Sequence, residues 1–196
     1  MSIIIAYKQG DTVYMGTDTR VIVNEKKRNE LCECNYKIQK LDNGIILGIT
    51  AERLERQTIM AYSDIFTLNK RGNLTRKHIV TEIIPKLINV LQDNDLMSSK
   101  EGELPYMKAD IALAHKGVLY EICSAFGVIR YENFQALGFA SKFVQATLLA
   151  SGSNCDVESR IVKALDVAAA NSPQVGKPYL LIDTKNLEYK LIGDND

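Results

Sequence analysis

The stretch that decides the fold is SIIIAYKQGDTVYMGTDTR, residues 2–20. Its first part, Ser2–Tyr7, is an apolar run rich in β-branched residues, which is typical of a strand. The turn signal Gln9-Gly10-Asp11 separates this run from a second one over Thr12–Met15. The chain is therefore expected to open with an antiparallel hairpin.

A second hairpin is predicted around Asp42-Asn43-Gly44, which lies between the apolar runs Tyr36–Leu41 and Ile45–Ile49. An Asn-Gly pair tolerates positive φ at both central positions of a tight turn, so this is the strongest hairpin signal in the chain. The segment between the two hairpins, Val21–Asn35, is polar and is expected to be irregular.

The pattern then becomes helical. Apolar residues recur every three or four positions across Glu52–Leu68 and again across Thr75–Asp93, which predicts two amphipathic helices. Pro85 lies inside the second helix and is expected to kink it or to mark its true first turn. The polar stretch Asp93–Leu104 is expected to be a loop.

The second half of the chain repeats this order of strands followed by helices. Four strands are expected, then two helices, the second capped by Asn154 or Asp156, and then a closing hairpin. Strands in blocks and helices in pairs favour helix layers on antiparallel sheets over alternating βαβ units. The predicted strands are Ala109–His115, Val118–Cys123, Val128–Tyr131, Phe134–Gly138, Tyr179–Asp183 and Glu188–Leu191, and the predicted helices are Ser141–Ala150 and Cys155–Ala170.

Composition excludes several classes of protein. The 196 residues include 24 Lys plus Arg and 24 Asp plus Glu, so the net charge is zero and the electrostatic signature of nucleic-acid or anionic-membrane binding is missing. The apolar runs are too short to span a bilayer, and no export signal opens the chain. We therefore expect a single cytoplasmic domain over residues 1–196, with reduced thiols at Cys32, Cys34, Cys123 and Cys155.

Common catalytic signatures are missing as well. The only two histidines, His78 and His115, are interpreted as solvated side chains. Cys32-Glu33-Cys34 has a poor spacing for tetrahedral zinc, and no two glycines form a G-x-G. No metal and no cofactor are predicted, so any chemistry must come from less obvious groups.

Two stretches carry a resemblance to a known family. Residues 2–20, followed by YKIQKLDNGIILGITAERLE over 36–55, resemble proteasome β-type subunits and the bacterial HslV-type peptidase. Ser2 falls where that family has its N-terminal threonine, Gly16-Thr17-Asp18 matches its G-x-D, and Lys37 matches its lysine. The resemblance implies the N-terminal-nucleophile hydrolase fold, an α+β architecture in which two antiparallel sheets, flanked by helix pairs, form a four-layer α/β/β/α sandwich.

The chemistry of Ser2, Lys37 and Asp18 suits an activated hydroxyl nucleophile. A hydroxyl is a weak nucleophile that needs a base, and removal of Met1 would give Ser2 a free α-amine with a pKa of about 7.7–8.0. A neighbouring ammonium, from Lys37, would favour the neutral amine, and the Asp18 carboxylate would hold that ammonium. Backbone N–H groups at Thr50-Ala51 would bind the oxyanion. The implied activity is hydrolysis of peptide or amide bonds.

Each of these residues also has a simpler interpretation. Serine is a common second residue, Asp18 fits a turn that closes a strand, and Lys37 fits the solvated face of a strand. If Met1 is retained, Ser2 has no free amine and the mechanism fails. These interpretations leave a catalytically inactive proteasome-fold subunit, acting in assembly or binding, as the alternative.

The chain also departs from the family pattern around the nucleophile. Active members show a G-S-G-like turn where this chain has Gly138-Phe139-Ala140, and Ala51 stands where glycine is usual. Asn171 occupies the expected aspartate position in the stretch Asn171–Gly176. Under either interpretation, the resemblance implies a homo-oligomeric ring, fed with protein substrate by an ATP-dependent unfoldase.

Overall fold

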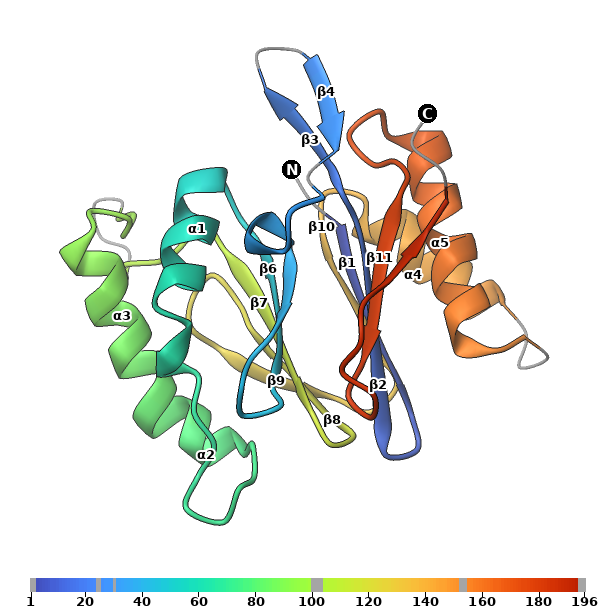
Figure 1. Cartoon of the computed structure of the whole chain (residues 1–196). Helices are drawn as coiled ribbons and strands as arrows, with labels where there is room; N and C mark the ends of the chain where they lie inside the picture. Colours follow the sequence, from blue (N-terminus) through green and yellow to red (C-terminus); the bar gives the residue numbers. More distant parts are fainter. Residues whose placement is uncertain (1–2, 24–25, 30, 100–103, 152–154, 194–196) are drawn as a thin grey trace.

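The computed structural model describes residues 3–23, 26–29, 31–99, 104–151 and 155–193. Two five-stranded antiparallel sheets lie face to face in the centre, and helices cover the outer face of each (Figure 1). The predicted four-layer α/β/β/α sandwich is confirmed. Ser2 lies outside the described residues.

The first sheet contains strands from both ends of the chain, in the order β10-β1-β2-β11-β12. Within it β1 runs between β10 and β2, so that Ile3 lies opposite Gly138 and Ile4 lies opposite Thr17. The start of β1 is therefore held on both sides. The strands are β1 (Ile3–Gln9), β2 (Thr12–Asp18), β10 (Phe134–Gly138), β11 (Tyr179–Asp183) and β12 (Lys190–Ile192).

The second sheet has the simple order β5-β6-β7-β8-β9. Its turn residues Lys116 and Gly117 both have positive φ, 44° and 72°. In the predicted Asn43-Gly44 turn only Gly44 does, at 80°, and its N–H donates to the Leu41 carbonyl over 2.9 Å. The predicted hairpin is confirmed, but only one of the two residues expected to have positive φ has it. The strands are β5 (Ile38–Lys40), β6 (Ile46–Thr50), β7 (Asp110–His115), β8 (Val118–Ile122) and β9 (Val128–Tyr131).

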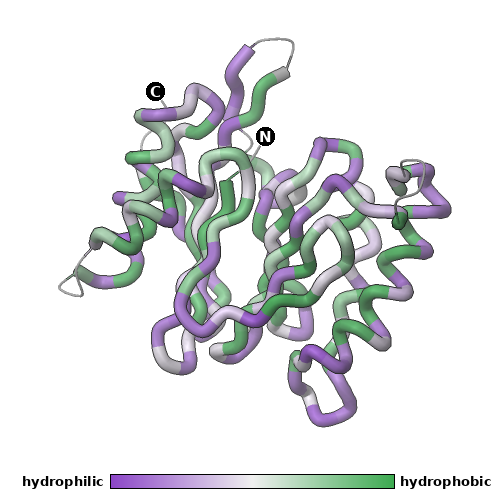
Figure 2. The backbone as a smooth tube through the Cα atoms, turned by 180° about the vertical axis from the view of Figure 1, so that it is seen from behind, coloured by the Kyte–Doolittle hydropathy of each residue, from purple (hydrophilic) through white to green (hydrophobic). Residues whose placement is uncertain are grey.

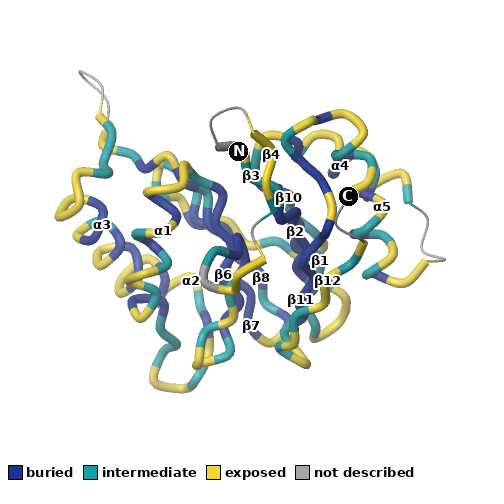
Figure 3. Tube along the Cα trace, turned by 45° about the horizontal axis from the view of Figure 1, so that its top comes forward, coloured by how far each residue is buried: buried dark blue, intermediate teal, exposed yellow. Residues whose placement is uncertain are grey.

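Three apolar layers hold the sandwich together. Along β1, Ile3 and Ile5 pack towards α4 (Ser141–Ala150) and α5 (Val157–Asn171), whereas Ile4 and Ala6 pack against the other sheet. On the far side, β6 sends Leu47 towards the other helices. Strands buried on both faces are apolar at every position, which explains the continuous runs in the sequence. The central strands are dark blue in Figure 3 and mostly green in Figure 2, buried and hydrophobic respectively.

The first helix layer departs from its prediction in detail. α1 (Arg53–Ala61) stops earlier than expected, and a 3-10 turn follows at Ser63–Ile65. The second helix begins at α2 (Arg76–His78), widens into a π-helical turn over Ile79–Ile83, and continues as α3 (Ile84–Asp93). Pro85 lies in the first turn of α3, as one of the two predictions had it, and it has no N–H to donate to the preceding turn.

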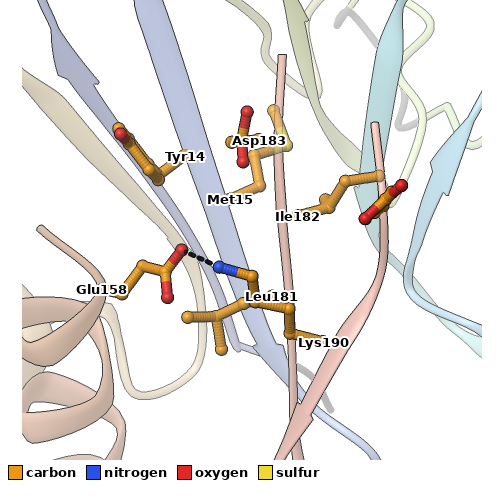
Figure 4. Close-up of a pocket in the computed structure, with 8 residues that line it drawn as sticks. Tyr14, Met15, Glu158, Leu181, Ile182, Asp183 and Lys190 are labelled. Atoms are coloured by element: carbon orange, nitrogen blue, oxygen red, sulfur yellow. Dashed lines mark hydrogen bonds and ion pairs between the residues drawn. The ribbon is translucent and has the colours of Figure 1, made fainter. Parts of the chain in front are cut away.

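The second helix layer follows its prediction closely. It consists of α4 (Ser141–Ala150) and α5 (Val157–Asn171). Asp156 is the cap of α5, since its carboxylate accepts the Ser159 N–H over 2.9 Å. The ion pair between Lys190 of β12 and Glu158 of α5, at 2.6 Å, ties this layer to the sheet edge (Figure 4).

The prediction that Val21–Asn35 is irregular is wrong. β3 (Arg20–Val23) and β4 (Lys26–Asn29) form a separate two-stranded ribbon that projects beyond the sandwich, and a 3-10 turn follows at Glu33–Asn35 (Figure 1). One strand of this ribbon is green and the other purple in Figure 2. A ribbon outside the core needs no apolar alternation, so β4 shows none.

The interpretation of both histidines as solvated is also wrong. His115 is 4% exposed and places Nδ1 3.2 Å from the Gly44 carbonyl oxygen, because its turn lies beside the turn at Gly44. His78 is half-buried and shares a hydrogen bond of 3.0 Å with the Thr67 hydroxyl. Among the described residues, no helix combines the length and the apolar character that crossing a bilayer would require.

Gly16 is expected to be essential for the packing of α5 on β2. A Cβ at this position would lie 2.4 Å from Ile161 Cγ2. Gly16→Ala should lower the free energy of unfolding by about 1–3 kcal/mol, measured by urea denaturation. Because Ile161→Ala removes the clashing methyl group, the double variant should lose less stability than the sum of the two single losses. Additive losses would contradict this assignment.

Candidate active site

The centre of the candidate site is a buried ion pair. Lys37 Nζ lies 2.8 Å from Asp18 Oδ1, and the two side chains are 3% and 0% exposed. Asp18 ends β2 of one sheet and Lys37 directly precedes β5 of the other. Lys37 Nζ also donates to the Arg20 carbonyl over 2.8 Å. The pair therefore connects the two sheets at one end of the sandwich.

The same carboxylate also contacts the start of the chain. Asp18 Oδ1 lies 3.4 Å from the Ile3 backbone nitrogen, which is bonded to the carbonyl carbon of Ser2. The Thr17 hydroxyl donates to the Ile3 carbonyl over 2.6 Å. Ile3 is thus fixed from two directions. Two of the predicted site residues, Asp18 and Lys37, therefore meet beside Ile3, which follows Ser2 in the sequence.

Burial sets the electrostatics of the pair. Desolvation raises the pKa of Asp18, while the Lys37 ammonium and the Ile3 and Arg20 amides act to lower it. The Arg20 N–H donates to Asp18 Oδ2 over 3.1 Å. Because neither side chain reaches solvent, each charge depends on the other for compensation.

These contacts decide between the interpretations left open by the sequence. Lys37 does not lie on a solvated strand face, since it is 2% exposed. Asp18 is indeed a turn residue, because it accepts the N–H of Arg20 two positions on. It is also the counterion of Lys37, so the two roles coexist in one carboxylate.

A hollow of about 340 Å³ opens beside the start of β1. Gly138, which pairs with Ile3, forms part of its wall, and Thr50 and Ala51 form another part. The Ala51 N–H has no hydrogen-bond partner within the described part of the chain. The third predicted element of the site, the Thr50-Ala51 turn, therefore lines the same hollow as the neighbour of Ile3.

Asp110 is a member of this hollow that sequence reasoning missed. It begins β7 opposite Thr50, and burial together with the nearby Glu121 raises its pKa. Glu121 is itself 7% exposed and accepts hydrogen bonds from Tyr131, over 2.7 Å, and from Gln135. A single aspartate at a strand start carries no local signal, so only the sheet register reveals it.

The structure also shows where the residues that depart from the family pattern lie. Asn171 is exposed and donates to the Val167 carbonyl of its own helix over 2.8 Å. Further along this segment, Arg20 Nη1 donates to the Val175 carbonyl over 3.0 Å. The Arg20 guanidinium occupies the space that a Cβ on Gly176 would need, at 2.0 Å. The segment that contains Val175 and Gly176 thus packs on Arg20. Phe139, in the other altered stretch, is 63% exposed.

The ion pair should be strongly coupled in stability. Lys37→Met leaves the Asp18 charge buried and unpaired, which should lower the free energy of unfolding by about 3–5 kcal/mol. Asp18→Asn should be similarly costly. The double variant Asp18→Asn/Lys37→Met should lose clearly less than the sum, as measured by chemical denaturation.

The surface pair Lys190–Glu158 provides a matched control for this cycle. Its side chains are 50% and 31% exposed. Lys190→Met should therefore lower the free energy of unfolding far less than Lys37→Met does. A strictly additive cycle at Asp18 and Lys37 would show that the two charges are not mutually compensated.

Comparison with known proteins places the fold. No protein-family model and no curated protein matches the chain. Among solved structures, BPH from Thiobacillus denitrificans is 15% identical with a TM-score of 0.74, covering 92% of this chain and 96% of that chain. Anbu (ancestral beta-subunit) from Yersinia bercovieri is 11% identical with a TM-score of 0.70, covering 98% and 88%.

A eukaryotic HslV, from Trypanosoma brucei, matches in the same way. It is 16% identical with a TM-score of 0.62, and the match covers 92% of this chain and 98% of that chain. At such identities the likeness establishes the fold, and activity has to be argued from the site. The resemblance seen in the sequence is therefore confirmed at the level of the fold: this chain has the N-terminal-nucleophile hydrolase fold of the proteasome β-type and HslV peptidases.

Proposed function

We propose that the chain is a proteasome-like N-terminal-nucleophile hydrolase of peptide or amide bonds, which uses Ser2 after removal of Met1. One observation carries the proposal. Asp18 Oδ1 is within hydrogen-bonding distance of both Lys37 Nζ, at 2.8 Å, and the Ile3 backbone nitrogen, at 3.4 Å. A buried lysine ammonium is thereby held at the residue that follows the proposed nucleophile.

The reaction then proceeds in two stages. The Ser2 hydroxyl oxygen attacks the scissile carbonyl carbon, and the Ser2 α-amine takes the hydroxyl proton. The amine passes this proton to the leaving nitrogen as the C–N bond breaks, which leaves an ester on Ser2. Water, deprotonated by the same amine, attacks the ester carbon, and the serine oxygen leaves with the proton.

The other residues act on charge in these steps. The Lys37 ammonium favours the unprotonated α-amine and stabilises negative charge at the serine oxygen. Asp18 holds Lys37 in place. The Ala51 N–H, which lines the hollow beside Ile3, donates to the oxyanion of the tetrahedral intermediate. No step needs a metal or a cofactor.

Chemical labelling tests this mechanism directly. A structure of BPH from Thiobacillus denitrificans has been solved in complex with epoxomicin, so this compound is a suitable probe. Intact-mass spectrometry of the native protein should show loss of Met1 and, after incubation with epoxomicin, addition of one inhibitor per chain. Ser2→Ala should abolish both the labelling and peptide hydrolysis, whereas Ser2→Thr, which keeps a hydroxyl, should retain labelling.

Two results would contradict the mechanism. A native chain that retains Met1 has no free amine on Ser2. Labelling that persists in Ser2→Ala would locate the reactive group elsewhere.

A catalytically inactive, proteasome-fold subunit acting in assembly or binding is the second candidate. The position of Asn171 favours it, because this side chain bonds to its own helix, and so does the lack of a hydroxyl in Gly138-Phe139-Ala140. Normal assembly and normal behaviour in cells of a Ser2→Ala variant would support this candidate over the enzyme.

Both candidates include assembly into a homo-oligomeric ring, with an ATP-dependent unfoldase as the partner that would supply protein substrates. Native mass spectrometry should give a single species whose mass is a multiple of the 21.9 kDa chain, allowing for Met1. A monodisperse monomer across micromolar concentrations would count against a proteasome-like role.

A further inference from the structure

The hollow beside Ile3 has the size and position of a substrate subsite. It lies where α1 begins, β7 begins and β10 ends, and its volume of about 340 Å³ falls in the range of ligand pockets. Because Gly138 in its wall pairs with Ile3, a group bound here lies beside the start of β1. Its lining residues are Thr50, Ala51, Glu52, Lys108, Asp110, Gly138 and Phe139.

The charge of the hollow is not compensated by the protein. Asp110 is half-buried, and its carboxylate accepts one long hydrogen bond, 3.3 Å from the Ser124 N–H. Within the described ranges, no ion pair involves Asp110. The buried Glu121 carboxylate acts on Asp110 with the same sign and so adds to the negative potential.

Lys108 does not neutralise this potential, although it lines the same hollow. Its backbone N–H donates to Glu55 Oε1 over 2.9 Å, and its charge acts on that carboxylate. Glu52, which is exposed and also lines the hollow, is a second carboxylate there. The hollow therefore attracts a cation.

Its apolar wall suits a long side chain. Phe139 is 63% exposed at the hollow, and Ala51 adds a small apolar surface. A lysine or arginine side chain combines an apolar stem with a charged end, and a guanidinium also packs favourably on an aromatic ring. Uncharged or acidic side chains lack the group that Asp110 would bind.

We propose that this hollow binds an arginine or lysine side chain of a peptide substrate, with the charged end on Asp110 and the stem against Phe139. The inference rests on the proposed function, since it names the substrate class of that same site. Asp110 is then the residue that determines specificity for basic side chains.

Binding without turnover provides the test. Fluorescein-labelled Leu-Leu-Arg-amide and its citrulline analogue, which has the same shape without the charge, are titrated into the Ser2→Ala protein by fluorescence anisotropy. The arginine peptide should bind roughly tenfold more tightly, because a charge-assisted hydrogen bond to a partly buried carboxylate is strong. Asp110→Asn should reduce this ratio to about one, since it removes the charge and keeps the shape.

Asp93→Asn is the matched control. It removes one negative charge at the exposed end of α3, as Asp110→Asn does in the hollow, so it changes the net charge equally and should leave the ratio unchanged. Thermal melts of all variants establish that each is folded. Equal binding of the two peptides, or a ratio that survives Asp110→Asn, would overturn the proposal.

Failure of this inference is distinguishable from failure of the proposed function. Charge-independent binding together with epoxomicin labelling of Ser2 would remove only the basic subsite. A charge-dependent ratio that disappears in Asp110→Asn, together with an unreactive Ser2, would leave a peptide-binding hollow without hydrolysis.

Discussion

The contact between Asp18 and Lys37 is the interaction on which the rest of the site depends. It forms where the ends of two strands from different sheets converge, and it is closed to solvent. A buried pair of this kind contributes little net stability but tolerates no loss of one partner. Its position next to Ile3 makes the geometry at the start of β1 a consequence of how the two sheets stack.

Much of the fold could be predicted because the sandwich has a strong local signature. Ile3, Ile4 and Ile5 are apolar in succession since β1 is covered on both faces, and strand blocks alternate with helix pairs in the sequence. The ribbon of β3 and β4 was missed because it packs on nothing that requires apolar alternation. The burial of His115 was missed because it depends on a neighbouring turn, Gly44, distant in sequence.

Some residues of the candidate site could likewise be predicted from the sequence, and others could not. The register of Asp18 and Lys37 could be predicted, because each stands at a fixed position in its strand relative to the family pattern, and the structure brings the two together. Asp110 could not, since its place beside Thr50 follows from the pairing of β6 with β7, which are separated by the whole first helix layer. The supporting residues differ from the pattern, and Asn171 turns back to its own helix. Fold and chemistry are therefore separate questions for this chain.

The projecting ribbon of β3 and β4 affects how copies of the protein associate with one another. In the described part of the chain, β3 and β4 form a sheet of two strands, and a strand edge is the usual template for adding a strand from another molecule. Its outer strand carries Lys26, Lys27 and Arg28, all exposed. Identical copies meeting edge to edge at this strand would bring these like charges together, so the ribbon resists unspecific self-association through it.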